Sequence, residues 1–209
     1  MLIALALQLA ATALLPHSAR ADAPKIVFLG DSLTAGYGLD PADAYPALIE
    51  KKLADEKLAW KVVNAGLSGD TTAGGSRRLG WVLRQKPSVL VVALGGNDML
   101  RGIPPEQTEK NLDSILRQAK EAGARPVLLG MRAMTNLGAD YRKAFDSLYA
   151  RLARKHSVEL LPFYIEDVAM KAELNQADGI HPTAEGQKKI AARVGAFLVP
   201  LLRKWGKSP

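Results

Sequence analysis

A serine stands where a buried strand is expected to end. The apolar run Ile26–Leu29 stops at Gly30, and Asp31 and Ser32 follow at once. The carboxyl ends of parallel strands open onto the binding crevice of such a sheet, so Ser32 is a candidate nucleophile. A serine at the start of a helical turn could instead cap the helix. Asp31 is expected to have a structural role, because it can accept hydrogen bonds from the backbone of the turn.

The groups that would activate a serine hydroxyl lie far downstream. Asp178 and His181 are three residues apart in Asp-Gly-Ile-His-Pro. An imidazole can take the hydroxyl proton and return it to a leaving group, while a carboxylate on its other nitrogen fixes tautomer and orientation. The sequence therefore predicts a catalytic triad of Ser32, Asp178 and His181. Two alternatives stay open. His181 could cap a loop, or it could ligate a metal together with Asp31 and Asp178, although no second histidine and no cysteine is within reach by spacing.

Four short blocks, which include these residues, follow one another along the chain. They are Gly30–Leu33, Asn64–Thr71, Gly95–Asp98 and Asp178–Pro182. In this order they resemble the SGNH family of serine hydrolases, also called the GDSL family, whose blocks contribute a serine, a glycine, an asparagine and a histidine. The segments Leu161-Pro162-Phe163 and Leu100-Arg101-Gly102 are similar to the bacterial branch with thioesterase, arylesterase and lysophospholipase activities.

This resemblance implies three hydrogen-bond donors for the oxyanion of acyl transfer: the backbone N–H of Ser32, the backbone N–H of Gly69 and the side-chain amide of Asn97. The family glycine corresponds to Gly69 and not to Gly66. The resemblance also implies a serine esterase that forms an acyl-enzyme on Ser32 and needs no cofactor and no metal. Its expected substrates are acyl thioesters, aryl esters and lysophospholipids. Alternatively, the glycines and Asn97 could simply mark tight turns.

An apolar stretch after Asn97, residues 98–105, is expected to form a loop that lines an acyl groove. The candidate substrate-binding residues are Met99, Leu100, Ile103 and Ile180. The resemblance implies that this loop responds to substrate, and Gly102 would permit such motion. Equally, Met99 and Leu100 could be ordinary core residues.

Apolar runs and helix-length segments alternate along the chain. Strands are predicted at Ile26–Leu29, Val62–Val63, Val89–Leu94, Pro126–Leu129 and Val158–Leu161, and helices around 42–57, 71–85, 106–122, 141–156 and 184–204. This alternation predicts a three-layer α/β/α sandwich with a mainly parallel sheet of about five strands. Gly74 and Gly75 would weaken the first turn of their helix by roughly 1 kcal/mol each, which would suit a mobile segment at the rim of the site.

The composition of the 209 residues is that of an ordinary globular protein. We expect a signal peptide at residues 1–21, because an apolar segment too short to span a membrane ends in a small-x-small pattern. No Lys or Arg precedes that segment, which is unusual for a leader. The remainder, 22–209, would be one domain, periplasmic or secreted. The chain contains no cysteine, so no disulfide can support it there.

The formal charge of +7 favours anionic lipid or acyl substrates, with at most transient contact with a membrane surface. The cationic pairs are scattered, which argues against nucleic-acid binding, and the lack of a heptad pattern favours a monomer. The competing enzyme is a carbohydrate or small-ester deacetylase with the same triad. The competing non-enzyme is a flavodoxin-like binding module in which Ser32 and Thr34 cradle a phosphate or flavin.

Overall fold

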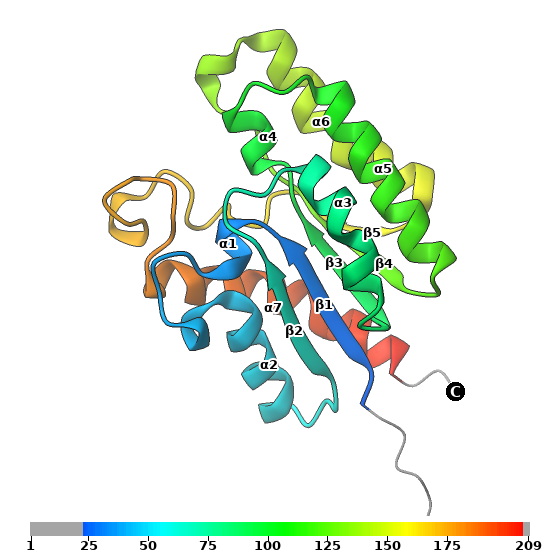
Figure 1. The fold of residues 1–209 in the computed structure, drawn as a ribbon. Coiled ribbons are helices and arrows are strands. Elements are labelled where there is room, and N and C mark those ends of the chain that lie inside the picture. Colours follow the sequence, from blue (N-terminus) through cyan, green and yellow to red (C-terminus); the bar gives the residue numbers. More distant parts are fainter. Residues whose placement is uncertain (1–22, 207–209) are drawn as a thin grey trace, which may run out of the picture.

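The computed structural model describes residues 23–206, so the predicted signal peptide lies outside the described part of the chain. Five parallel strands form one sheet in the order β2-β1-β3-β4-β5 (Figure 1). The strands are β1 (Lys25–Gly30), β2 (Lys61–Gly66), β3 (Val89–Ala93), β4 (Arg125–Leu129) and β5 (Glu159–Leu161). The predicted five-stranded α/β fold is confirmed.

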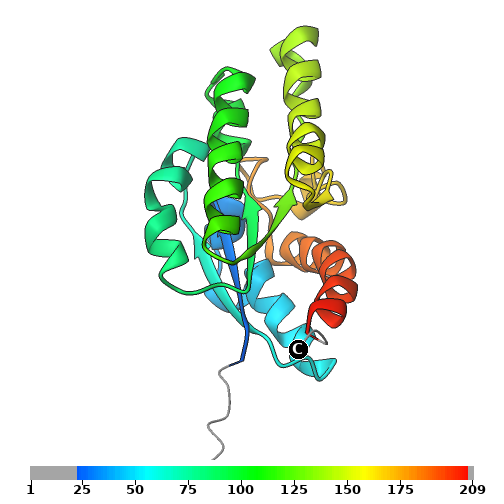
Figure 2. The ribbon, with the colours of Figure 1, turned by 90° about the vertical axis from the view of Figure 1, so that its right-hand side faces the viewer.

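Helices cover both faces of this sheet. They are α1 (Ser32–Ala35), α2 (Tyr45–Asp55), α3 (Thr72–Leu83), α4 (Gly96–Leu100), α5 (Pro105–Glu121), α6 (Ala139–His156) and α7 (Ala184–Trp205), with short 3-10 turns at η1 (Pro41–Asp43), η2 (Thr135–Leu137) and η3 (Ala172–Leu174). Helices α2 and α7 lie on one face, and α3, α5 and α6 lie on the other (Figures 1 and 2).

The core follows from the apolar pattern of these elements. Every residue of β3 is buried, as is Ile26–Leu29 of β1, because helices cover these central strands on both sides. Helix α5 buries residues at helical spacing, namely Leu112, Ile115, Leu116 and Ala119. Strand β2 lies at the edge of the sheet and includes the polar Asn64, which explains why its apolar signal covered only Val62–Val63.

The stretch after Asn97 differs from the predicted loop. Its first residues belong to α4, Pro105 begins α5, and only 101–104 connect the two helices. Gly95 adopts a positive φ of 119° before α4, and a Cβ there would lie 2.2 Å from the hydroxyl of Tyr149. Glycine at this position therefore lets the chain turn from β3 into α4 where a larger side chain would collide with Tyr149.

Within residues 23–206, no helix is both long enough and apolar enough to cross a membrane.

Candidate active site

The order of the strands brings the predicted site residues together. Ser32 follows the central strand β1, Gly69 follows its neighbour β2, and Asn97 follows β3 on the other side. All three residues line one cavity of about 590 Å³, and His181 lines it too. The cavity lies at the carboxyl ends of the strands, where the connection after β1 runs toward β2 and the connection after the adjacent β3 runs the opposite way, toward β4.

Ser32, His181 and Asp178 form an unbroken chain of hydrogen bonds. The Oγ atom of Ser32 is 2.9 Å from Nε2 of His181, and Nδ1 of His181 is 2.7 Å from Oδ2 of Asp178. An ionised carboxylate can only accept, so the ring proton is on Nδ1 and Nε2 is free to accept the proton of Ser32. The structure thus joins groups that are 149 positions apart in the sequence.

Asp178 organises its own turn. Its Oδ1 accepts hydrogen bonds from the backbone N–H groups of Ile180 and His181, both at 3.0 Å, and Gly179 takes a positive φ of 75°. Hydrogen bonding to the His181 side chain, followed by the bonds from these two N–H groups, lowers the pKa of Asp178 to about 2. Asp178 is therefore ionised at neutral pH and can stabilise a protonated imidazole.

Two residues that the sequence did not single out hold His181 in place. The ring of Tyr37 packs on the imidazole, with 4.6 Å between the ring centroids. Gln176 donates its backbone N–H to the carbonyl of His181, and its side-chain amide to the carbonyls of Tyr37 and Pro182. Gln176 therefore ties the histidine loop to the segment that follows the nucleophile helix.

Asp31 has the structural role expected for it. Its Oδ1 accepts the backbone N–H of Leu33 and so caps α1, the short helix that begins at Ser32. The residue is only 2% exposed, and this burial raises the pKa of its carboxyl to about 6. The carbonyl of Leu33 accepts a bond from Gln187 of α7, so the nucleophile helix is also fixed from the face covered by α7.

The three residues that carry the candidate oxyanion donors all line the cavity. Neither the N–H of Ser32 nor that of Gly69 bonds to a backbone carbonyl within residues 23–206. Gly69 has a φ of 78°, a conformation that favours glycine, and its carbonyl accepts a bond from Arg101 at 2.8 Å. The neighbouring Gly66 has a different reason to be glycine, because a Cβ there would lie 2.3 Å from the backbone nitrogen of Ala35.

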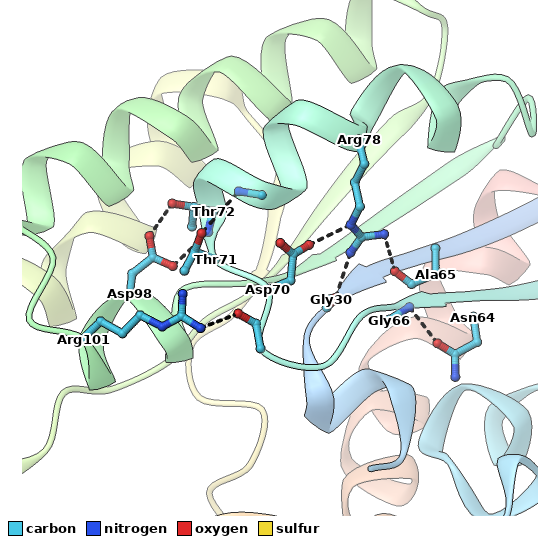
Figure 3. A network of polar contacts seen from close by, with 12 residues as sticks. Gly30, Asn64, Ala65, Gly66, Asp70, Thr71, Thr72, Arg78, Asp98 and Arg101 are labelled. Carbon is cyan, nitrogen blue, oxygen red and sulfur yellow. Dashed lines mark hydrogen bonds and ion pairs between the residues drawn. The ribbon is translucent and has the colours of Figure 1, made fainter.

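Asp98 joins α4 to the start of α3, which directly follows the loop that carries Gly69. Its carboxylate is fully buried and accepts hydrogen bonds from the backbone N–H and the hydroxyl of Thr72 (Figure 3). It also accepts a hydrogen bond from the hydroxyl of Thr108. The two outer donors, Gly69 and Asn97, are thus linked through Thr72, three residues after Gly69, and Asp98, which directly follows Asn97.

Three of the four candidate substrate-binding residues line the cavity. Met99 is buried, whereas Leu100 and Ile180 are about half exposed. Ile103 does not line the cavity, so that prediction is wrong: it lies in the link after α4, and its carbonyl accepts the hydroxyl of Tyr141. Further apolar walls come from the chain after β4 and β5 and include Met131, Met134, Phe163, Ile165, Ala169 and Met170.

Among residues 23–206, no three His, Cys, Asp or Glu side chains are grouped so that they could hold a metal ion. The alternative in which Asp31 joins Asp178 and His181 as metal ligands therefore has no support in this part of the chain.

Comparison with known proteins gives consistent matches. The model of the GDSL-like Lipase/Acylhydrolase family matches residues 28–189. Esterase TesA of Pseudomonas aeruginosa is 42% identical over 184 residues, which are 88% of this chain and 92% of that protein. Thioesterase 1/protease 1/lysophospholipase L1 of Escherichia coli K12 is 43% identical over 183 residues, 87% of this chain and 86% of that protein. A crystal structure of the esterase EstA from Pseudoalteromonas sp., inhibited by monoethylphosphonate, has a TM-score of 0.82 at 31% identity and covers 86% of this chain and 98% of that one.

Proposed function

Because the chain belongs to the GDSL-like lipase/acylhydrolase family, we propose that it is a serine hydrolase that cleaves ester and thioester bonds of acyl substrates through an acyl-enzyme on Ser32. The observation that carries this proposal is the hydrogen-bonded chain from Ser32 through His181 to Asp178 at the wall of the cavity. A binding module would have no use for that chain, whereas a hydrolase needs all three groups.

In the proposed acylation step, Oγ of Ser32 attacks the carbonyl carbon while Nε2 of His181 takes its proton. The carbonyl oxygen becomes negative and is stabilised by the N–H groups of Ser32 and Gly69 and by the amide of Asn97. Asp178 stabilises the protonated imidazole. His181 then gives the proton to the departing alkoxide or thiolate as its bond to the acyl carbon breaks.

Deacylation repeats these steps with water as the nucleophile. His181 takes a proton from the attacking water, and the second tetrahedral intermediate uses the same three donors. When the bond to Oγ breaks, His181 returns the proton to Ser32, and the carboxylic acid leaves. No cofactor takes part in the proposed cycle.

The cavity supports an acyl substrate rather than a short polar one. Its volume of about 590 Å³ lies in the range typical of sites for small molecules. Its walls contain methionine, phenylalanine and isoleucine side chains, which favour an alkyl chain over a sugar. Related proteins are named an esterase and a thioesterase and lysophospholipase, and we propose aryl esters, acyl thioesters and lysophospholipids as substrates here.

The proposed place of action is the periplasm or the exterior, and the proposed oligomeric state is a monomer. The composition of residues 1–21 supports export. Amino-terminal sequencing of protein from a periplasmic fraction should give a chain that begins at Asp22. Recovery from the cytoplasm with Met1 in place would contradict this proposal.

The enzymatic proposal is tested with p-nitrophenyl esters from acetyl to palmitoyl, using the wild type and Ser32→Ala. We expect the variant to lose at least about 10³-fold in kcat, since a missing nucleophile leaves only the contribution of the oxyanion donors and binding. Ser114→Ala in α5, outside the cavity, is the matched control.

The chain-length profile adds a second criterion. A maximum at medium or long chains supports an acyl hydrolase, whereas activity confined to the acetyl ester would identify a deacetylase. Equal activity of wild type and Ser32→Ala would overturn the mechanism.

A further inference from the structure

Arg78 of α3 reaches toward the loop that carries Gly69, and its guanidinium contacts three acceptors from three segments (Figure 3). Nη2 donates to the carbonyl of Gly30 at 2.9 Å, and Nη1 donates to the carbonyl of Ala65 at 2.7 Å. Nε donates to Oδ2 of Asp70 at 2.7 Å. The side chain of Arg78 is 19% exposed and that of Asp70 is 6% exposed, so water competes little for these bonds.

Each acceptor lies next to a candidate oxyanion donor or on the strand that leads to one. Gly30 ends β1 two residues before Ser32, and Ala65 belongs to β2. Asp70 directly follows Gly69. A guanidinium is planar and rigid, so bonds from its three nitrogens fix the end of β1 against the segment that carries Gly69.

Gly74, in the first turn of α3, makes room for this arrangement. A Cβ at Gly74 would lie only 1.7 Å from Oδ1 of Asp70. Glycine weakens a helix, yet any side chain here would displace the carboxylate that Arg78 holds. The glycines that the sequence suggested as a mobile rim are both buried: Gly75 is packed too, with a Cβ position 2.3 Å from Leu94.

We propose that Arg78 is a positioning residue of the oxyanion hole, which sets the backbone N–H of Ser32 and the backbone N–H of Gly69 at the distance that binds one oxygen. The inference rests on the proposed function. Arg78 does not line the cavity, so it acts through Gly30, Ala65 and Asp70.

Small displacements matter at such a site. Oxyanion donors act at about 2.7–3.1 Å from the oxygen, and a displacement of about 1 Å can cost about 10²-fold in rate. The negative oxygen exists only in the transition state and intermediates, so a misplaced donor lowers kcat and leaves KM nearly unchanged.

The experiment compares kcat and KM for a p-nitrophenyl ester in the wild type, Arg78→Met and Arg78→Lys, well below each unfolding midpoint. We expect Arg78→Met to lower kcat about 10- to 100-fold with KM changed less than about threefold. Arg78→Lys should have a kcat close to that of Arg78→Met, because an ammonium keeps the charge but lacks the rigid, planar set of donors of a guanidinium. Arg151→Met, which breaks a two-bond ion pair with Glu109 outside the cavity, is the matched control and should keep its kcat.

Gly74→Ala tests the same arrangement without changing Arg78, and it serves if Arg78→Met does not fold. The added methyl must displace Asp70, so we expect kcat to fall although alanine favours the helix. Gly80→Ala in the same helix meets no atom within 4 Å, so it should be more stable than the wild type with unchanged kcat.

The second readout is the rate of inactivation by a p-nitrophenyl phosphonate ester. Oγ of Ser32 bonds to phosphorus, p-nitrophenolate leaves, and the phosphoryl oxygen takes the place of the oxyanion. We expect Arg78→Met and Gly74→Ala to slow inactivation about as much as they lower kcat.

Two results would overturn the inference: a lowered unfolding midpoint with kcat within twofold of the wild type, or a raised KM with unchanged kcat. Either would make Arg78 a residue of stability or binding alone. Failure of the proposed function looks different, because the wild type would then hydrolyse no ester or Ser32→Ala would keep full activity.

Discussion

The two halves of the site are built in contrasting ways. Ser32, 8% exposed, begins a helix fixed by the core, and buried side chains hold the donors around it. Asp178 and His181 lie on a loop without helix or strand, and the side chain of Asp178 is 41% exposed. The nucleophile is therefore positioned by tertiary packing, whereas the base is positioned by a few bonds near the surface. A substitution in the loop should therefore change the rate of catalysis and leave the stability of the fold nearly unchanged. A substitution beside Ser32 can change the stability as well.

The largest expected effect on the loop comes from His181→Ala. Removal of the base should lower kcat about 10⁴-fold or more, because neither Ser32 nor water is then deprotonated in the transition state. The unfolding midpoint should fall by no more than about 4 °C, since His181 lies on a loop outside the helices and strands and a loss of about 1 kcal/mol shifts the midpoint of a domain of this size by about 2–4 °C. Steady-state kinetics and a thermal melt check both. A large drop in the midpoint would mean that the loop is part of the cooperative core.

A smaller effect is expected from Gln176→Ala, which removes the bonds to the carbonyls of Tyr37 and Pro182. His181 would keep its carboxylate but lose part of its support, so kcat should fall about tenfold with an unchanged melt. Gln107→Ala on α5 is the control. Equal kinetics for the two variants would show that the backbone of the loop suffices to hold the imidazole.

The third expected effect is one on stability rather than on kcat, and it comes from Asp31→Asn. The raised pKa of about 6, against an ordinary value of 3.8, means that the folded state binds the proton more tightly than the unfolded state. This contribution is complete below pH 4 and is lost as the pH rises through 6. The stability lost between pH 4 and pH 7 is therefore about 3 kcal/mol.

Asparagine keeps the cap on Leu33 and cannot ionise. Asp31→Asn should therefore melt several degrees above the wild type at pH 7, and the difference should vanish below pH 4. If the midpoints of the variant and the wild type differ by the same amount at pH 4 and at pH 7, the ionisation of Asp31 does not contribute to that difference.

The sequence was informative where a function depends on local pattern. Unbroken apolar runs located β1, β3 and β4, and the spacing of Asp178 and His181 reflects one turn that both residues form. The helix α4 escaped prediction because two glycines precede Asn97, and it is fixed by tertiary hydrogen bonds that Thr72 donates to Asp98.

Residues that act over long distances in the chain could not be predicted in this way. The acceptors of Arg78 include carbonyls 13 and 48 positions away, and a carbonyl leaves no mark in the sequence. The same holds for Tyr37, which meets His181 only because two distant loops fold together. Ile103 was assigned to the cavity from its apolar character alone, which does not tell where a side chain points.

The strand order β2-β1-β3 separates chemistry from recognition. Hydrogen-bonded strands lie about 4.8 Å apart whatever their side chains are, so the sheet itself sets the spacing of Gly69, Ser32 and Asn97. The apolar wall comes largely from residues 131–134 after β4 and 163–170 after β5, which precede the loop of Asp178 and His181. Substrate range can therefore diverge by substitutions in those two segments while the bond-breaking apparatus is inherited intact, which gives this architecture room to serve many different esters.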